Sequence, residues 1–147
     1  MQEIALCQNE ITRIAHKELF NLPDNSYIVD TDIIKEILKI STLEALRVHL
    51  CLNWSGLFNV ILWSDDLSSY LIKNILIKAG LEEKELKDMT YTEPLTFFYW
   101  LYYGKRFKIL RKLCHMARDM AQDKVRVVRF ECHLIAEEIP KIVASTL

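Results

Sequence analysis

Glycine and proline are scarce in this chain, and each occurs three times in 147 residues. The tight turns of β-hairpins depend on these residues, because glycine reaches positive φ and proline fixes φ at turn positions. Apolar residues, in contrast, recur at helical spacing through most of the sequence, and the few breakers lie between the periodic segments. We therefore predict an all-α fold, a compact bundle of roughly six to eight short antiparallel helices.

Each expected helix rests on an apolar stripe with a cap or a breaker beside it. A capping box of Ser41 and Glu44 opens one helix, and Gly80 closes another. The expected helices are Glu3–Phe20, Thr31–Ile40, Thr42–Trp54, Leu57–Leu62, a helix that begins after Ser64, Asp65 and Asp66, Leu95–Tyr103, Lys105–Ala121 and Asp123–Glu138. We divide the chain into an N-terminal helix and loop (1–29), a helical bundle (30–113) and a partial second helical unit packed on that bundle (114–147).

Composition excludes several classes of protein. Hydrophobic residues make up 51% of the chain, charged residues make up 27%, and the net charge is −1, the balance of a globular protein. No apolar segment approaches the roughly 18 residues that cross a bilayer, so we expect no membrane insertion. The four cysteines form no C-x-x-C pair, and the first residues do not resemble a secretory signal. We expect free thiols and a cytoplasmic location.

The sequence contains no recognisable catalytic motif. It has no glycine-rich phosphate loop, no G-x-S-x-G elbow and no H-E-x-x-H metal motif. Two Cys-His neighbours, Cys114-His115 and Cys132-His133, could together form a zinc site only if their two expected helices were adjacent. Neighbouring residues of a helix point about 100° apart, so neither pair easily chelates one metal. We predict no enzymatic activity, no metal site and no cofactor.

One expected helix and the residues after it carry a dense positive charge. Residues 105–129 contain nine Lys or Arg and two acids. Helical spacing directs Phe107, Leu110 and Leu113 inward and leaves the cations in solvent. A buried Phe107 could not stack on a nucleic-acid base, and an apolar face packed in a bundle is not available to a membrane. The positive face is expected to contact acidic surfaces of other proteins rather than nucleic acid.

Several segments resemble the death-effector domain, a six-helix member of the death fold. Val48–Asn53 (VHLCLN) resembles the second-helix signature of that family. Leu57–Leu62 (LFNVIL), with the leucines and isoleucines that follow, resembles its fourth and fifth helices. Arg106–Leu110 (RFKIL) resembles its closing Arg-x-Asp-Leu-Leu motif, with Lys108 where the family has aspartate. The resemblance implies that residues 30–113 form a death-effector-like bundle.

The last part of the sequence resembles a second, partial copy of the same domain. Val128–Cys132 (VRFEC) is similar to the second helix of the family, and Arg129 and Phe130 match it. The whole arrangement most resembles the paired domains in the prodomain of insect Dredd-type initiator caspases. The resemblance implies a non-catalytic protein–protein interaction module for homotypic assembly in apoptotic or innate immune signalling, which recruits an adaptor or an initiator caspase.

The partners that the resemblance implies are proteins with death-effector-like helical domains, including a second copy of this chain. In this hypothesis His49 and Leu50 stand for the exposed apolar pair of the family, and the cations form the opposite half of the contact. The implied interaction residues are His49, Leu50, Arg106, Lys108, Arg111, Lys112, Arg129 and Phe130.

Two other interpretations stay open. A viral-type Bcl-2-like helical inhibitor of host apoptosis or immune signalling would bind a partner helix in a groove. The aromatic segment with Phe97, Phe98 and Trp100 allows such a central helix, and Asn53–Gly56 (NWSG) is similar to the Asn-Trp-Gly-Arg signature of that family without its arginine. A hydrophobic surface groove would favour this interpretation, and a filled six-helix bundle would favour the death fold. The third interpretation is a helical structural subunit without an activity of its own.

Overall fold

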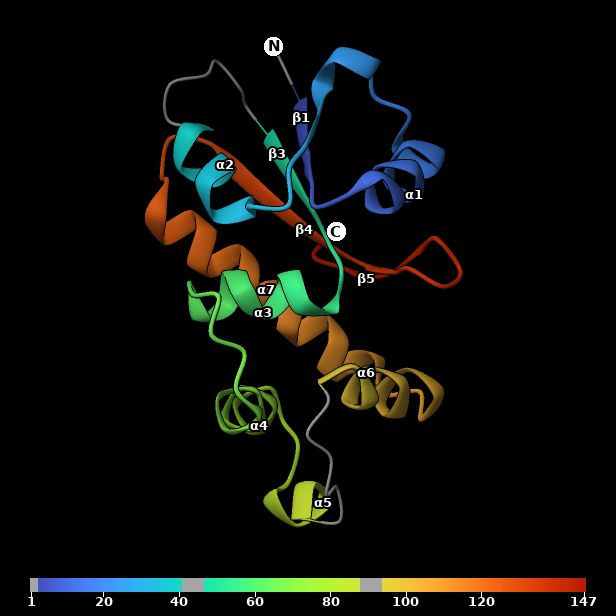
Figure 1. Ribbon diagram of the computed structural model, residues 1–147, viewed down its shortest axis with the longest axis vertical. Coiled ribbons are helices and arrows are strands. Elements are labelled where there is room, and N and C mark those ends of the chain that lie inside the picture. The colour runs from blue at the N-terminus through green and yellow to red at the C-terminus, as the bar shows by residue number, and fades with distance from the viewer. Residues whose placement is uncertain (1–2, 41–46, 88–93) are drawn as a thin grey trace.

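The computed structural model shows an α/β fold, so the all-α prediction is wrong (Figure 1). The structure describes residues 3–40, 47–87 and 94–147. One five-stranded sheet has the strand order β2-β1-β3-β4-β5, in which the first four strands are parallel and β5 is antiparallel to β4. The strands are β1 Glu3–Cys7, β2 Tyr27–Val29, β3 Arg47–Leu52, β4 Arg129–Ala136 and β5 Lys141–Ser145.

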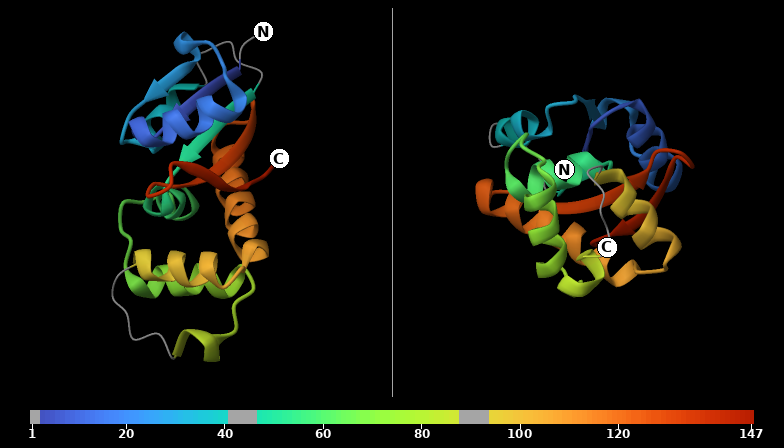
Figure 2. Two further views of the ribbon diagram at one scale, coloured as in Figure 1. Left: turned by 90° about the vertical axis from the view of Figure 1, so that its right-hand side faces the viewer. Right: turned by 60° about the horizontal axis from the view of Figure 1, so that its bottom comes forward.

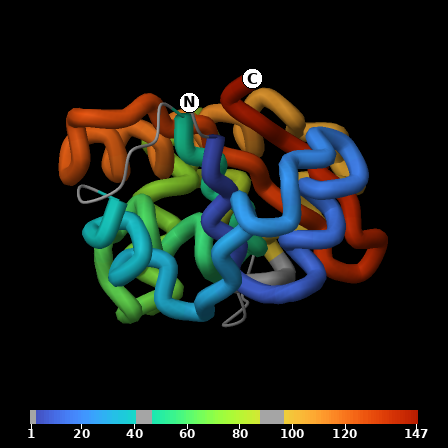
Figure 3. Tube along the Cα trace, turned by 90° about the horizontal axis from the view of Figure 1, so that it is seen from above, coloured from blue at the N-terminus to red at the C-terminus, as the bar shows by residue number. Residues whose placement is uncertain are grey.

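Helices cover both faces of this sheet. The described helices are α1 Glu10–Phe20, the short 3-10 helix η1 Asp24–Ser26, α2 Ile33–Lys39, α3 Trp54–Leu62, α4 Ser69–Lys78, α5 Glu83–Lys87, α6 Pro94–Tyr103 and α7 Phe107–Lys124. Helix α1 packs on one face, and α2, α3 and α7 pack on the other (Figure 2). Seen from above, α1 and α2 lie on different sides of β1 (Figure 3). Helices α4, α5 and α6 lie beyond the carboxyl ends of the strands (Figure 1).

Strands β3 and β4 have side chains that alternate between two different environments. The residues facing the larger core are Val48, Leu50, Leu52, Phe130, Cys132 and Leu134. The residues on the face that α1 covers are His49, Cys51, Glu131, His133 and Ile135. A repeat of two residues is the periodicity of a strand. The predicted helix over Asp123–Glu138 is therefore wrong from residue 125 onward, where a loop leads into β4. The predicted helix Thr42–Trp54 is wrong over residues 47–53.

The scarcity of glycine and proline does not exclude this sheet. Parallel strands are joined by long crossovers, usually helices, and need no tight hairpin turn. The antiparallel pair β4–β5 is joined by a turn at residues 137–140, which contains Pro140. A chain with few turn residues can therefore form a mainly parallel sheet as readily as a helical bundle.

Helices predicted from apolar stripes are present where no strand replaces them. Helices α2, α3, α4, α6 and α7 match expected helices with shifted ends. The first expected helix is instead strand β1 followed by α1, which begins at a capping box between Asn9 and Thr12. Gly80 follows α4 with a φ of 121°, as expected of a residue that ends a helix. The capping box predicted for Ser41 and Glu44 lies outside the described residues.

The two faces of the sheet differ in what they bury. The main core fills the space between the sheet and α2, α3, α6 and α7. The cluster beneath α1 is smaller and consists of Ala5, Cys7, Ala15, Cys51 and Ile135. Small side chains leave room for polar groups on that face, and the candidate site described below lies there.

Segments that the sequence suggested as separate units are interleaved in one sheet. Strands β1 and β2 come from 1–29, β3 comes from 30–113, and β4 and β5 come from 114–147. The four cysteines are buried free thiols. In the described part of the chain, no helix combines the length and the apolar character needed to cross a membrane.

Candidate metal centre

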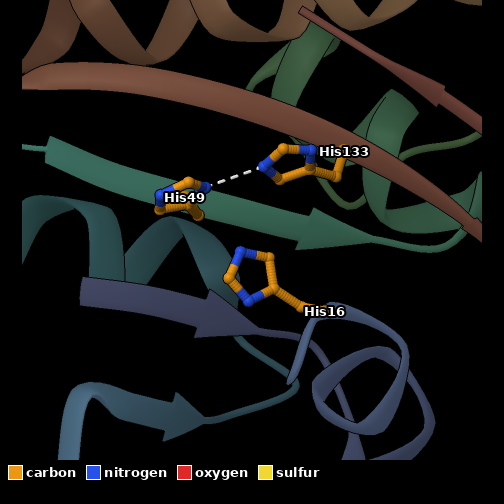
Figure 4. A group of neighbouring side chains, drawn as sticks. All are labelled: His16, His49 and His133. Carbon is orange, nitrogen blue, oxygen red and sulfur yellow. Dashed lines mark hydrogen bonds between the residues drawn. The ribbon is translucent and has the colours of Figure 1, made fainter. Parts of the chain in front are cut away.

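Three histidines from distant parts of the chain meet between α1 and the sheet (Figure 4). His16 belongs to α1, His49 to β3 and His133 to β4. Their exposed fractions are 0%, 1% and 0%. One ring nitrogen of each lies within 4.8 Å of the corresponding nitrogens of the other two. In the described residues, this is the group of His, Cys, Asp or Glu side chains with a spacing that could hold a metal ion.

The sheet register and the face of α1 bring these rings together. On β3 and β4, His49 is opposite Glu131 and Cys51 is opposite His133, so the two histidines share one face and are diagonal neighbours. Helix α1 turns Thr12, Ala15 and His16 toward that face, at the spacing of one helical stripe. Helix α1 therefore brings the His16 imidazole against the same face of the sheet.

Hydrogen bonds link two of the histidines into a chain that ends at a carboxylate. His49 Nε2 lies 2.8 Å from Glu3 Oε2, and because a carboxylate accepts, this nitrogen donates. In the neutral ring His49 Nδ1 then accepts from His133 Nε2, also at 2.8 Å. His133 Nδ1 accepts in turn from the Ser145 hydroxyl at 2.8 Å. The Leu147 N–H donates to the same Ser145 oxygen at 3.1 Å, which leaves the hydroxyl hydrogen for His133.

His16 is held at one nitrogen and left without a partner at the other. Its Nδ1 lies 2.8 Å from the Tyr27 hydroxyl. Its Nε2 is buried and has no hydrogen-bond partner, and Figure 4 shows it directed toward His49 and His133. A buried polar atom without a partner costs about 1–3 kcal/mol. The cluster therefore contains an unsatisfied ring nitrogen that faces two other imidazoles.

Burial keeps the cluster uncharged. Burial, together with the nearby His49, lowers the pKa of His16 to about 3. Burial and the neighbouring His49 and His16 lower the pKa of His133 to about 2. The pKa of His49 is also lowered, first by burial, although the hydrogen bond to Glu3 acts in the opposite direction. All three rings are neutral near pH 7, the form in which imidazole binds metals.

Two carboxylates and two aromatic rings, those of Phe20 and Tyr27, surround the imidazoles. Glu3 is bonded to His49, and the buried Glu131 side chain also acts on His49 through its charge. Glu131 has Arg129 Nε at 3.6 Å, but the arginine side chain is 65% exposed. The Phe20 ring stacks on His16 with centroids 4.5 Å apart. The surroundings therefore favour an added positive charge and restrict access from solvent.

The residues predicted to form a protein-contact surface do not lie on one surface. His49 and Leu50 are buried in the central strand β3, and Phe130 is buried in β4. Arg129 is exposed at the start of β4. The remaining four lie on α7 or at its N-cap, namely Arg106, Lys108, Arg111 and Lys112. The expected apolar pair of His49 and Leu50 is therefore not exposed, and the same holds for Phe130.

The predicted exposure of the cations near α7 holds for three of the four and not for Arg106, which is half-buried. Lys108, Arg111 and Lys112 are exposed. Arg106 instead forms an ion pair with Glu85 at 2.7 Å. Phe107, predicted to point inward, is 46% exposed.

Sequence reasoning missed most of the cluster. The sequence predictions do not include His16, they place His49 on an exposed surface, and they consider His133 only in a zinc site with Cys114, His115 and Cys132. The alternation in RVHLCL and RFECHLIA is the signal that could have found two of the three, because it places His49 and His133 on the same side of neighbouring strands. No comparable pattern in α1 identifies His16.

Comparisons with models of known protein families, with curated proteins and with solved structures gave no match to this chain.

Proposed function

We propose that this protein binds one divalent transition-metal ion, zinc foremost, between α1 and the sheet. The ligand atoms are His16 Nε2, His49 Nδ1 and His133 Nε2. The observation that carries the proposal is the buried, unpartnered Nε2 of His16, which faces the ring nitrogens of the other two histidines. Imidazole nitrogen is a preferred ligand of zinc, copper and nickel.

The outer nitrogen of each histidine already has the partner that a metal ligand needs. Histidine ligands usually give their other N–H to a carboxylate or a comparable acceptor, which orients the ring. The partners are Tyr27 for His16, Glu3 for His49 and Ser145 for His133. Metal binding requires that His133 carry its proton on Nδ1 rather than Nε2, and the Ser145 oxygen can accept a hydrogen bond from Nδ1 as well as donate one.

A small movement would bring the three ring nitrogens to the spacing of three ligands of a tetrahedral zinc ion, whose fourth position would be left to a solvent molecule. At zinc–nitrogen distances of about 2.0–2.1 Å, two ligand nitrogens lie about 3.3 Å apart. The His49 and His133 nitrogens, now 2.8 Å apart, must therefore separate slightly. His16 must move toward them with α1. The metal would tie α1 to β3 and β4, so its role at this buried position is to stabilise the fold.

The assembly module suggested by the resemblance is not carried forward. It required a six-helix bundle with His49 and Leu50 on its surface, whereas the chain forms a sheet with both residues inside. The Bcl-2-like interpretation required a helical bundle as well. The cytoplasmic location expected for free thiols remains part of the proposal.

The test is the metal content and affinity of the protein purified without a histidine tag. We expect elemental mass spectrometry to find about one zinc ion per chain. When Co²⁺ replaces the zinc, we expect visible d–d absorption bands. At a free zinc concentration 100 times the Kd, the folded state gains about 2.7 kcal/mol, which a thermal melt resolves. His16→Ala is expected to abolish stoichiometric binding.

Two further variants separate ligand loss from damage to the fold. Glu3→Ala removes only the partner of His49, on a side chain that is 43% exposed, and is expected to weaken zinc binding about 10- to 100-fold. His115→Ala, a half-buried histidine of α7 outside the cluster, should bind zinc as the wild type does. Wild-type protein that takes up no zinc, or a folded His16→Ala variant with unchanged affinity, would disprove the metal site.

A further inference from the structure

A pocket lies at the carboxyl ends of β3 and β4, and none of the three clustered histidines lines it. Its volume is about 220 Å³. One wall is the aromatic side of α6, with Phe98, Tyr99 and Tyr102, and another is the start of α3 with Trp54. The chain after β4, including Glu137 and Glu138, forms the rest. Neither the core packing nor the proposed metal site uses this space.

The position of this pocket in the sheet is one where α/β proteins bind ligands. The chain leaves β1 toward β2 on one side and later leaves β3 toward β4 on the other. In open sheets ligands bind outside the carboxyl ends of the strands at such a switch point, which here lies between β1 and β3, and the pocket lies beside it at the ends of β3 and β4. The ends of β1, β3 and β4 are tied together here, because Glu137 accepts hydrogen bonds from Asn9 and Asn53, both at 2.7 Å. The pocket therefore has a rigid polar floor.

The charges of the pocket select its ligand. Its lining includes two carboxylates, Glu137 and Glu138, and no Lys or Arg among the described lining residues. Glu137 is bonded to neutral amides and Glu138 to the Tyr99 hydroxyl, so neither carboxylate is neutralised by these partners. The hydrogen bond to Glu138 and partial burial raise the pKa of Tyr99 to about 12, so this hydroxyl stays a donor. Phosphates and other anions are therefore disfavoured.

The aromatic wall suits the same kind of ligand. Phe98 and Tyr102 are stacked with centroids 5.7 Å apart, and Trp54 lies 5.5 Å from Phe98. Aromatic faces attract cations through the ring quadrupole and also bury apolar groups. We propose that this pocket binds a small organic cation, an ammonium or guanidinium group on an apolar body, with its charge beside Glu138 and its body against Trp54 and Tyr102.

Three probes of similar size test this charge preference. Benzylamine, benzyl alcohol and benzoate carry a positive, a neutral and a negative group on the same ring. We expect benzylamine to bind and to shift the NMR signal of the Trp54 indole N–H, benzyl alcohol to bind at least about tenfold more weakly, and benzoate not to bind. Equal binding of the amine and the alcohol, binding of benzoate, or binding of none of the three would overturn the proposal.

Matched variants test whether the Glu138 carboxylate causes the preference for a cation. Glu138→Gln, at an exposed position, is expected to weaken benzylamine binding about tenfold and to leave benzyl alcohol unchanged. Glu83→Gln, an exposed acid of α5 outside the pocket, should change neither. An equal loss for both probes in Glu138→Gln would contradict a charge contact. The measurement is made with and without zinc, so that its outcome is independent of the proposed metal site.

Discussion

Replacement of Leu50 by aspartate is expected to unfold the protein. Leu50 is fully buried in the central strand β3, where Leu6 is its register partner on β1 and Cys132 its partner on β4. Aspartate would lose about 2–3 kcal/mol of apolar burial and leave a carboxylate without a partner in the core, at a cost of several kcal/mol more. Since domains are stable by only about 5–15 kcal/mol, the sum removes most or all of the stability.

Circular dichroism and urea denaturation would measure this loss. The matched control is Lys108→Asp, a charge change on the exposed side of α7, which is expected to alter the free energy of unfolding by less than about 0.5 kcal/mol. A Leu50→Asp variant with a cooperative transition near that of the wild type would contradict the position of β3 inside the sheet. A helical bundle with Leu50 on its surface predicts that outcome, so the experiment separates the two folds directly.

Acidification from pH 7 to pH 5 is expected to lower the free energy of unfolding of the metal-free protein by about 4 kcal/mol, about 2 kcal/mol from each of two buried histidines. In the unfolded chain His16 and His133 have pKa values of about 6.5. In the folded protein these values are about 3 and about 2, because both rings are buried beside another imidazole. Between these limits the unfolded state binds more protons, so stability falls as the pH falls below about 6.5 and the loss continues toward pH 3.

Urea denaturation at several pH values, with a chelator present, gives this slope. His16→Gln is expected to remove about half of the dependence, because one of the two strongly shifted groups is then absent. The lowered pKa of His49 adds to the effect in the same direction. A stability that is unchanged between pH 7 and pH 5 would show that the histidines are not buried as a neutral cluster.

Local signals in the sequence were sufficient for much of the helical structure. Helices α2, α3, α4, α6 and α7 follow from apolar stripes and from breakers such as Gly80 and Pro94. These signals depend on residues only a few positions apart, so they predict helices without knowledge of the fold. The scarcity of glycine and proline was also visible in the sequence, but it argues only against many tight turns, and the chain still forms a mainly parallel sheet with one antiparallel pair, β4–β5.

The strands were misassigned for a physical reason. A strand buried on both faces is apolar on both, and in a short segment such a run cannot be distinguished from a buried helix. The segment VHLCL is therefore compatible with a buried helix, and its similarity to an apolar helical motif favours the same wrong prediction. Parallel partners such as Ala5 and His49, or His49 and Glu131, are far apart in the chain, and no local pattern identifies them.

The sequence by itself determined the residue types, most helices and the free cysteines. Only the tertiary structure decided that β3 lies between β1 and β4, that α1 covers their polar face, and that His16 reaches the other two rings there. Helix propensity and capping depend on residues that are close in the sequence. The order of the strands, and the face of the sheet to which each side chain points, depend instead on which segments distant in the sequence pack against each other. The candidate metal centre arises from the second kind of interaction.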